Sequence, residues 1–236
     1  MKVETESDKL LGLVVNSSAT WKNHLYGDQD NQGLIPQLSK RIGMLKKIIK
    51  HLPNLKFRIL VNGLFSSKLI YCMTVWGGVW GLPGSYDEEV RNGISISKED
   101  MRKLQVLQNR VMRLMTNLEP GTSTELLCGR SNQMSVHQLV AYHSVCQAHK
   151  IFHSQKPVYH YGRLFGSTLH DVQTRGERNL QSRIDFDLSL ARSSFFFQAS
   201  RLWNLIPMNV KQNPCSEILK KKIRIWIRSN IDVRPK

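Results

Sequence analysis

Closely spaced cysteines, long apolar runs and, over much of the chain, acidic residues are all missing from this sequence of 236 residues. Its four cysteines are far apart and form no Cys-x-x-Cys pair: Cys72, Cys128, Cys146 and Cys215. This spacing argues against a disulfide scaffold or a zinc ribbon and predicts reduced thiols. The longest uncharged run begins at Leu69 and ends before Asp87, and glycines together with Pro83 leave its apolar part too short to span a bilayer as a helix.

The amino-terminal residues do not have the composition of a signal peptide. Met1–Glu6 is polar and acidic, whereas a signal peptide has a basic segment followed by an apolar one. We therefore expect an intracellular protein, nuclear or cytoplasmic and not secreted, without a membrane partner.

Acidic residues are absent from Asn31 through Tyr86, although the chain's average of 18 acids in 236 residues would place about four in a stretch of this length. Eight basic residues fall in the same stretch: Lys40, Arg41, Lys46, Lys47, Lys50, Lys56, Arg58 and Lys68. The whole chain has 34 Lys and Arg and a formal net charge of +16, so its average field attracts polyanions. Charge alone does not distinguish a nucleic acid from an anionic membrane surface.

Apolar periodicity predicts a mainly α-helical chain with a short strand at its start. Leu11, Leu13 and Val15 alternate with Gly12, Val14 and Asn16, and polar residues follow. This pattern is typical of a short strand and turn. Apolar residues recur every three or four positions in Pro36–Leu52, and Pro53 follows, which predicts an amphipathic helix with a basic outer face. A second and more apolar helix is predicted from Asn54 to about Val75.

Capping-box patterns predict three further helix starts. Ser97–Asp100 opens the most strongly periodic helix of the chain. Thr122–Glu125 opens a short helix that Gly129 is expected to close, and Ser135–Gln138 opens a longer one that reaches about Ser154.

The last third of the chain is predicted to alternate between irregular and helical segments. We expect a loop-like stretch from Pro157 through Asp187, a helix over Ser193–Trp203 and a break at Ile206–Pro207. The final predicted helix, Ser216 to about Ser229, is rich in basic residues: Lys220, Lys221, Lys222, Arg224 and Arg228.

Three short blocks stand in a fixed order along the chain: Lys9–Asn16 with Trp21 and His24 behind it, Leu104–Arg110, and Ser194–Phe195 followed by Trp203–Pro207. Together they resemble the C-terminal portion of the reverse transcriptase of non-LTR retrotransposons of the jockey-like kind. The resemblance extends from about Lys9 to about Ile227, and it rests on the order and spacing of the blocks.

The resemblance implies a short N-terminal β-hairpin, a helical thumb-like bundle and a helical C-terminal segment. Residues 1–33 correspond to the end of the palm with the primer-grip hairpin, 34–118 to the thumb, and 119–236 to the C-terminal segment with an irregular part near 157–187. In this family the polymerising aspartates lie on the palm, upstream of the matched region. We therefore expect no catalytic residue here, although the family is one of RNA-directed DNA polymerases. Mg²⁺ is expected only with the missing palm, which together with the fingers is an expected partner.

The resemblance also implies roles for individual residues. The basic helix and its successor would lie along RNA or DNA, as a template–primer duplex or the element's own RNA, through Lys40, Arg41, Lys46, Lys47, Lys50, Lys56 and Arg58. The primer-grip-like residues are Leu11, Gly12 and Leu13, for which the alternation alone indicates only an ordinary buried strand. Trp203, Asn204 and Pro207 would form a structural corner.

Other candidate sites have weaker patterns. His143, Cys146, His149 and His153 share one side of a predicted helix, but ten residues of helix extend about 15 Å and cannot close four ligands around one ion, so no metal is expected. Asp185 and Asp187 are interpreted as surface residues paired with arginines. Four rings could stack on bases, although such rings more commonly pack in the core or at its rim: Tyr142, Tyr159, His160 and Tyr161. A decayed or repurposed retroelement piece that binds proteins through exposed aromatic residues is the alternative function: Trp76, Trp80, Phe195, Phe196 and Phe197.

Overall fold

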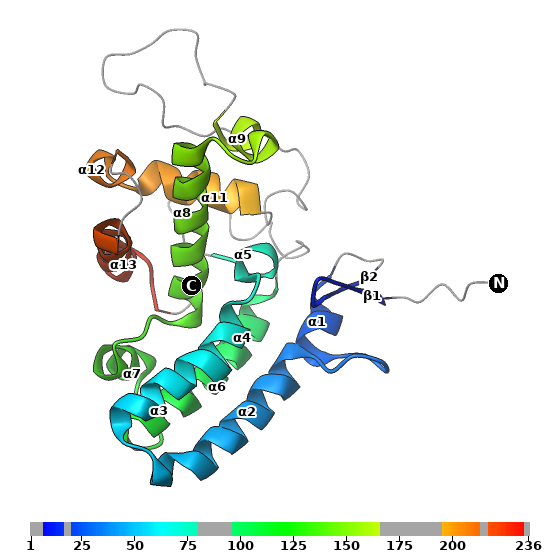
Figure 1. Cartoon of the computed structure of the whole chain (residues 1–236), viewed down its shortest axis with the longest axis vertical. Coiled ribbons are helices and arrows are strands. Elements are labelled where there is room, and N and C mark those ends of the chain that lie inside the picture. The colour runs from blue at the N-terminus through cyan, green and yellow to red at the C-terminus, as the bar shows by residue number, and fades with distance from the viewer. Residues whose placement is uncertain (1–6, 17–19, 80–95, 166–194, 213–216, 234–236) are drawn as a thin grey trace, which may run out of the picture. The chain divides into compact units, whose positions relative to one another are not determined.

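The computed structural model describes residues 7–16, 20–79, 96–165, 195–212 and 217–233. Within these ranges it is mainly helical and begins with a two-stranded antiparallel hairpin, as the sequence predicts (Figure 1). The described residues divide into two compact units, one containing residues 7–77 and 96–136 and the other residues 78–79 and 137–233. Both predicted boundaries, after residues 33 and 118, fall inside the first unit, where α1 (Lys22–Tyr26) packs on α2 (Leu34–Ile48) and α7 (Thr124–Ser131) packs on α6 (Lys98–Thr116).

The hairpin consists of β1 (Ser7–Leu10) and β2 (Leu13–Asn16), with Leu10 opposite Leu13. Leu11 and Gly12 form the two-residue turn, both with positive φ (48° and 85°), the backbone that matches the twist of the strands. The strand expected to begin at Leu11 therefore begins at Leu13, and the Leu11 side chain is 81% exposed. The sequence pattern misled because leucine rarely adopts this backbone.

The predicted amphipathic helix is present as α2 (Leu34–Ile48), which continues into a 3₁₀ turn over Ile49–His51. It follows the short helix α1 (Lys22–Tyr26). Leu38 and Leu45 are completely buried, which confirms the apolar stripe. Pro53 stands as the N-cap of the next helix, so the predicted stop is also confirmed.

The second apolar helix is built from four pieces: α3 (Asn54–Val61), a π-helical turn (Asn62–Ser66), α4 (Ser67–Ile70) and α5 (Met73–Trp76). Its buried side chains recur almost every fourth residue: Phe57, Val61, Phe65, Leu69, Met73 and Trp76. A regular α-helix would rotate this stripe away from the core, and the wider π turn compensates for that rotation. The chain bends at Cys72, whose φ is 50°.

Asn54–Trp76 is also long and apolar enough, by length and composition alone, to cross a membrane. Buried helices of soluble proteins meet the same criterion. The absence of a membrane partner therefore stays a prediction.

Helices α6 (Lys98–Thr116) and α7 (Thr124–Ser131) complete the first unit. The Ser97 hydroxyl accepts a hydrogen bond from the Asp100 N–H at 3.1 Å, which confirms the first predicted cap. The second cap was predicted one residue too early, since Ser123, and not Thr122, accepts from the Leu126 N–H at 3.3 Å. Gly129 does not close α7.

Two buried glutamines of α6 explain part of the Leu104–Arg110 block. The Gln105 side-chain oxygen accepts from the Val136 N–H at 2.7 Å, and the Gln108 amide donates to the Met134 carbonyl at 2.9 Å. The two side chains also hydrogen-bond to each other at 2.9 Å. The polar positions of this block therefore hold the segment after α7 within the first unit.

The second unit contains α8 (Val136–Ser154), α9 (Val158–Phe165), α11 (Phe195–Leu205), α12 (Met208–Lys211) and α13 (Glu217–Asn230). The ends of α8 and α13, and the break before α12 at Pro207, agree with the sequence. The loop expected from Pro157 is wrong for its first part, which is α9. Pro157 does not interrupt this helix because it precedes it, and its carbonyl accepts from the Tyr161 N–H at 3.0 Å.

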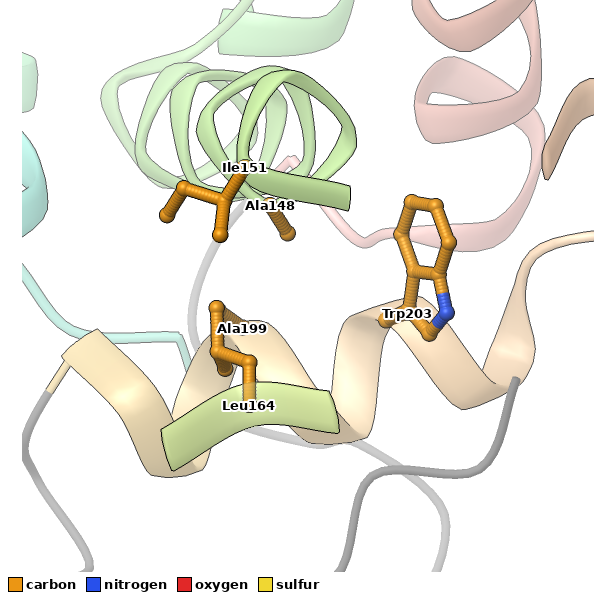
Figure 2. Packing of buried hydrophobic residues seen from close by; sticks show 5 residues of the cluster. All are labelled: Ala148, Ile151, Leu164, Ala199 and Trp203. Carbon is orange, nitrogen blue, oxygen red and sulfur yellow. The ribbon is translucent and has the colours of Figure 1, made fainter. Parts of the chain in front are cut away.

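A hydrophobic cluster joins three helices of the second unit. Ala148 and Ile151 of α8, Leu164 of α9, and Ala199 and Trp203 of α11 pack together (Figure 2). The Trp203 ring lies 5.2 Å from the Phe152 ring and 5.4 Å from the Phe165 ring, measured between centroids.

The end of α13 returns to the start of α8. The Gln138 side chain donates to the Ile231 carbonyl at 2.9 Å, and His137 Nδ1 lies 2.9 Å from the Asp232 carbonyl oxygen. Ile231 is itself buried. The C-terminal turn is therefore fixed mainly through its backbone.

Candidate nucleic-acid interface

Three lysines of α2 and a fourth in the 3₁₀ turn that follows it lie outside the buried stripe of the helix. Lys40, Lys46, Lys47 and Lys50, here called the α2 lysine face, are all exposed. None of them forms a salt bridge with a residue that the structure describes. From residue 31 to residue 79 the sequence holds no carboxylate, so the helix and its immediate successors carry charge of one sign.

The other predicted contact residues differ from this face in their surroundings. The guanidinium of Arg41 donates to the Leu64 carbonyl, and that of Arg58 donates to the Ser131 carbonyl. Both arginines are half-buried, so at least part of each guanidinium holds helices together. Lys56 is exposed at the start of α3.

Positive charge continues from α2 towards the hairpin. Burial lowers the pKa of the Lys68 amine on α4, and the nearby charges of Arg41 and Lys9 lower it further. Two cations from two other elements, Arg41 of α2 and Lys9 of β1, therefore act on Lys68. The acid-free stretch of the sequence includes Lys68, whereas Lys9 lies outside it.

The hairpin turn lies against Tyr71, the residue that follows α4. The Tyr71 hydroxyl donates to the Leu11 carbonyl at 2.6 Å, and a Cβ atom on Gly12 would lie 3.5 Å from the Tyr71 ring. Of the three primer-grip-like residues, Leu11 is exposed, Gly12 is half-buried and Leu13 is buried. Leu13 therefore anchors the turn that carries the other two.

His24 of α1 is buried behind the hairpin. The Val14 N–H donates to its Nδ1 at 3.4 Å, and its ring lies 6.0 Å from the ring of Trp76. Burial lowers the pKa of His24 to about 4, and the positive charge of Lys68 acts in the same direction. The folded protein therefore keeps this imidazole neutral at pH 7.

We expect the free energy of unfolding to fall by about 3 kcal/mol between pH 7.5 and pH 4 through His24 alone. In the unfolded chain His24 binds a proton below about pH 6.5, whereas in the folded chain it does so only near pH 4, so acid favours unfolding. Above about pH 6.5 His24 is neutral in both the folded and the unfolded chain, so its burial no longer lowers the free energy of unfolding. Urea unfolding followed by circular dichroism at both pH values measures this change.

His24→Gln keeps an acceptor for the Val14 N–H and removes the titrating group, so it isolates this effect from the carboxylates. The variant should lose about 3 kcal/mol less than the unaltered protein over the same pH interval. Equal pH dependence in the two proteins would contradict the role of His24.

The structure shows where the histidine row of α8 lies. Among the described residues no group of three or more His, Cys, Asp or Glu side chains is placed to hold an ion. The rings of His149 and His153 stack at 4.2 Å, and His153 Nε2 lies 2.9 Å from the Lys211 carbonyl oxygen. Burial lowers the pKa of His143.

The aromatic residues proposed for protein binding are less exposed than expected. Trp76 is completely buried, which corrects its assignment as an exposed contact, because it closes the buried stripe of the second apolar helix. Phe195 and Phe196 are half-buried against the Trp203 cluster, and the Phe197 ring lies 5.3 Å from the guanidinium carbon of Arg201. Trp80 lies outside the described residues, as do Asp185 and Asp187.

The predicted corner lies at the end of α11. Trp203 is buried, its carbonyl accepts from the Ile206 N–H at 3.2 Å, and Pro207 begins the turn into α12. Asn204 is exposed. Of the candidate stacking rings, Tyr159 is exposed, while Tyr142, His160 and Tyr161 are half-buried.

No family model matches this chain, and neither the curated proteins nor the solved structures include a significant match to it.

Proposed function

We propose that this chain binds nucleic-acid duplexes through their phosphates, as the thumb and C-terminal part of a non-LTR retrotransposon reverse transcriptase. The observation that carries the proposal is the α2 lysine face, which is exposed on a helix anchored by Leu38 and Leu45 and has no carboxylate partner among the described residues. Exposed lysines on a rigid helix neutralise phosphates and release counterions, whatever the base sequence.

Other cations add to the positive field of the first unit. Lys56 follows the α2 lysine face in the chain, and Lys9 and Lys68 continue the positive field. A phosphate backbone would relieve the mutual repulsion of these cations. We propose no chemical step, because the paired aspartates of a polymerase are expected on the palm and not in this chain.

Binding of the unaltered chain to an RNA–DNA hybrid should weaken steeply with salt. With about four phosphate contacts, the slope of log affinity against log salt is about −3.6, which lowers affinity about 150-fold between 50 and 200 mM salt. Fluorescence anisotropy with two hybrids of unrelated sequence measures both the slope and the sequence dependence.

Equal slopes and similar affinities are expected for the two hybrids. An affinity that does not change with salt would contradict the proposal, because an apolar interface lacks counterion release and does not weaken as salt rises. That result would favour a protein-binding role.

A further inference from the structure

One residue of α2 has no side chain in the middle of the lysine face. Gly43 is exposed and lies within the helix Leu34–Ile48, with more than one full turn on either side. Apart from its two chain neighbours and the backbone of α2 itself, a Cβ atom built on it would meet no atom within 4 Å. Packing therefore does not require glycine at this position.

Glycine is also unfavourable here for the helix itself. In a helix interior it lowers stability relative to alanine, because the unfolded chain loses more conformational freedom when it folds. Gly33 presents the opposite case, since a Cβ atom there would lie 2.2 Å from the backbone nitrogen of Gly27. Close packing thus explains Gly33 and leaves Gly43 without a reason within the fold.

The surroundings of Gly43 are the four lysines of the α2 lysine face. Lys40 precedes it by three residues, Lys46 and Lys47 follow it by three and four, and Lys50 follows it by seven. Residues at these spacings are neighbours on one side of a helix. The bare backbone of Gly43 is therefore the floor of a surface whose rim consists of ammonium groups.

We propose that Gly43 is the point at which the sugar–phosphate backbone of a bound duplex lies directly against α2. This inference rests on the proposed function and adds the place and the manner of contact. With no side chain at Gly43, a strand can approach the helix closely enough for lysines on both of its sides to reach phosphates. A larger side chain would hold the strand away and separate it from one side of the rim.

The test replaces Gly43 by glutamine, which is uncharged, favours helices and has open space around it. Gly129 of α7 provides the matched control, because it is also an exposed helical glycine with no atom within 4 Å of a built Cβ. Both Gly43→Gln and Gly129→Gln should raise the melting temperature. Only Gly43→Gln should weaken binding to an RNA–DNA hybrid, by tenfold or more at 100 mM salt. Gly43→Ala should give a smaller loss.

Unchanged affinity in Gly43→Gln, with salt-dependent binding intact, would overturn the inference and leave the proposed function standing. Equal losses in Gly43→Gln and Gly129→Gln would also overturn it, since the effect would not be local to α2. If the unaltered chain failed to bind the hybrid, both the inference and the proposed function would fall.

Discussion

Replacing Lys40, Lys46, Lys47 and Lys50 together by glutamine is expected to weaken binding to an RNA–DNA hybrid about a thousand-fold at 100 mM salt. Each lysine that neutralises one phosphate contributes close to one unit to the salt slope, so the slope should fall by about three to four units. Glutamine has nearly the same helix propensity as lysine, and all four side chains are exposed, so the fold should survive.

The matched control removes similar charge from another helix. Lys220, Lys221 and Lys222 of α13 are also exposed, and the Lys220 ammonium lies 2.7 Å from a carboxylate oxygen of Glu217. Changing all three to glutamine should reduce affinity much less. If both variants lost the same affinity and slope, the positive field would be diffuse. An unchanged slope in the α2 variant would exclude this helix as the contact.

Replacing Trp203 by alanine should lower the free energy of unfolding by about 3 to 5 kcal/mol. The indole is 1% exposed and packs against rings from α8 and α9, so its loss would leave a cavity that small neighbours such as Ala148 and Ala199 cannot fill. Urea or thermal unfolding measures the change.

Trp226→Ala is the control for Trp203→Ala, because Trp226 is a half-buried tryptophan on α13 of the same unit. Trp226→Ala should lower the free energy of unfolding by clearly less, since part of the Trp226 surface stays in water in the folded state. A Trp203→Ala protein of unaltered stability that no longer bound nucleic acid would show that Trp203 is a contact and not a structural corner.

Local signals predicted helix ends well where a single residue determines them. Ser97 caps α6 and Pro53 separates two helices, and each acts through its own hydroxyl or ring on neighbouring backbone groups. The choice between Thr122 and Ser123 could not be made in this way, because both residue types accept the same hydrogen bond. In the structure the Thr122 hydroxyl donates instead to the Glu119 carbonyl at 2.7 Å.

Features that depend on distant contacts were not visible in the sequence. The positive φ of Leu11 occurs in a turn that a hydrogen bond from Tyr71 holds, and that residue lies 60 positions later. The π turn at Asn62–Ser66 follows from the position of the buried stripe against α2 and α6. Neither the turn at Leu11 nor the π turn has a characteristic amino-acid composition from which it could be predicted.

The charged surface also combines features set by local sequence with features set by distant contacts. Exposed lysines on α2 follow from helical periodicity, since a residue opposite a buried stripe faces water. The contacts of Arg41 and Arg58 with backbone carbonyls require knowledge of which segment crosses each helix, and Ser131 is 73 residues away from Arg58. Charge counting therefore identified the region but could not separate the arginines from the lysines.

The return of residues 231 and 232 to the start of α8 affects when the second unit can finish folding during synthesis. The hydrogen-bond partners of His137 and Gln138 are backbone carbonyls that lie 95 and 93 residues later in the chain. A ribosome must therefore translate almost the whole of this unit before these two contacts can form. Since the partners are backbone carbonyls, substitutions at the last turn should matter far less for this step than a shortening of the chain would.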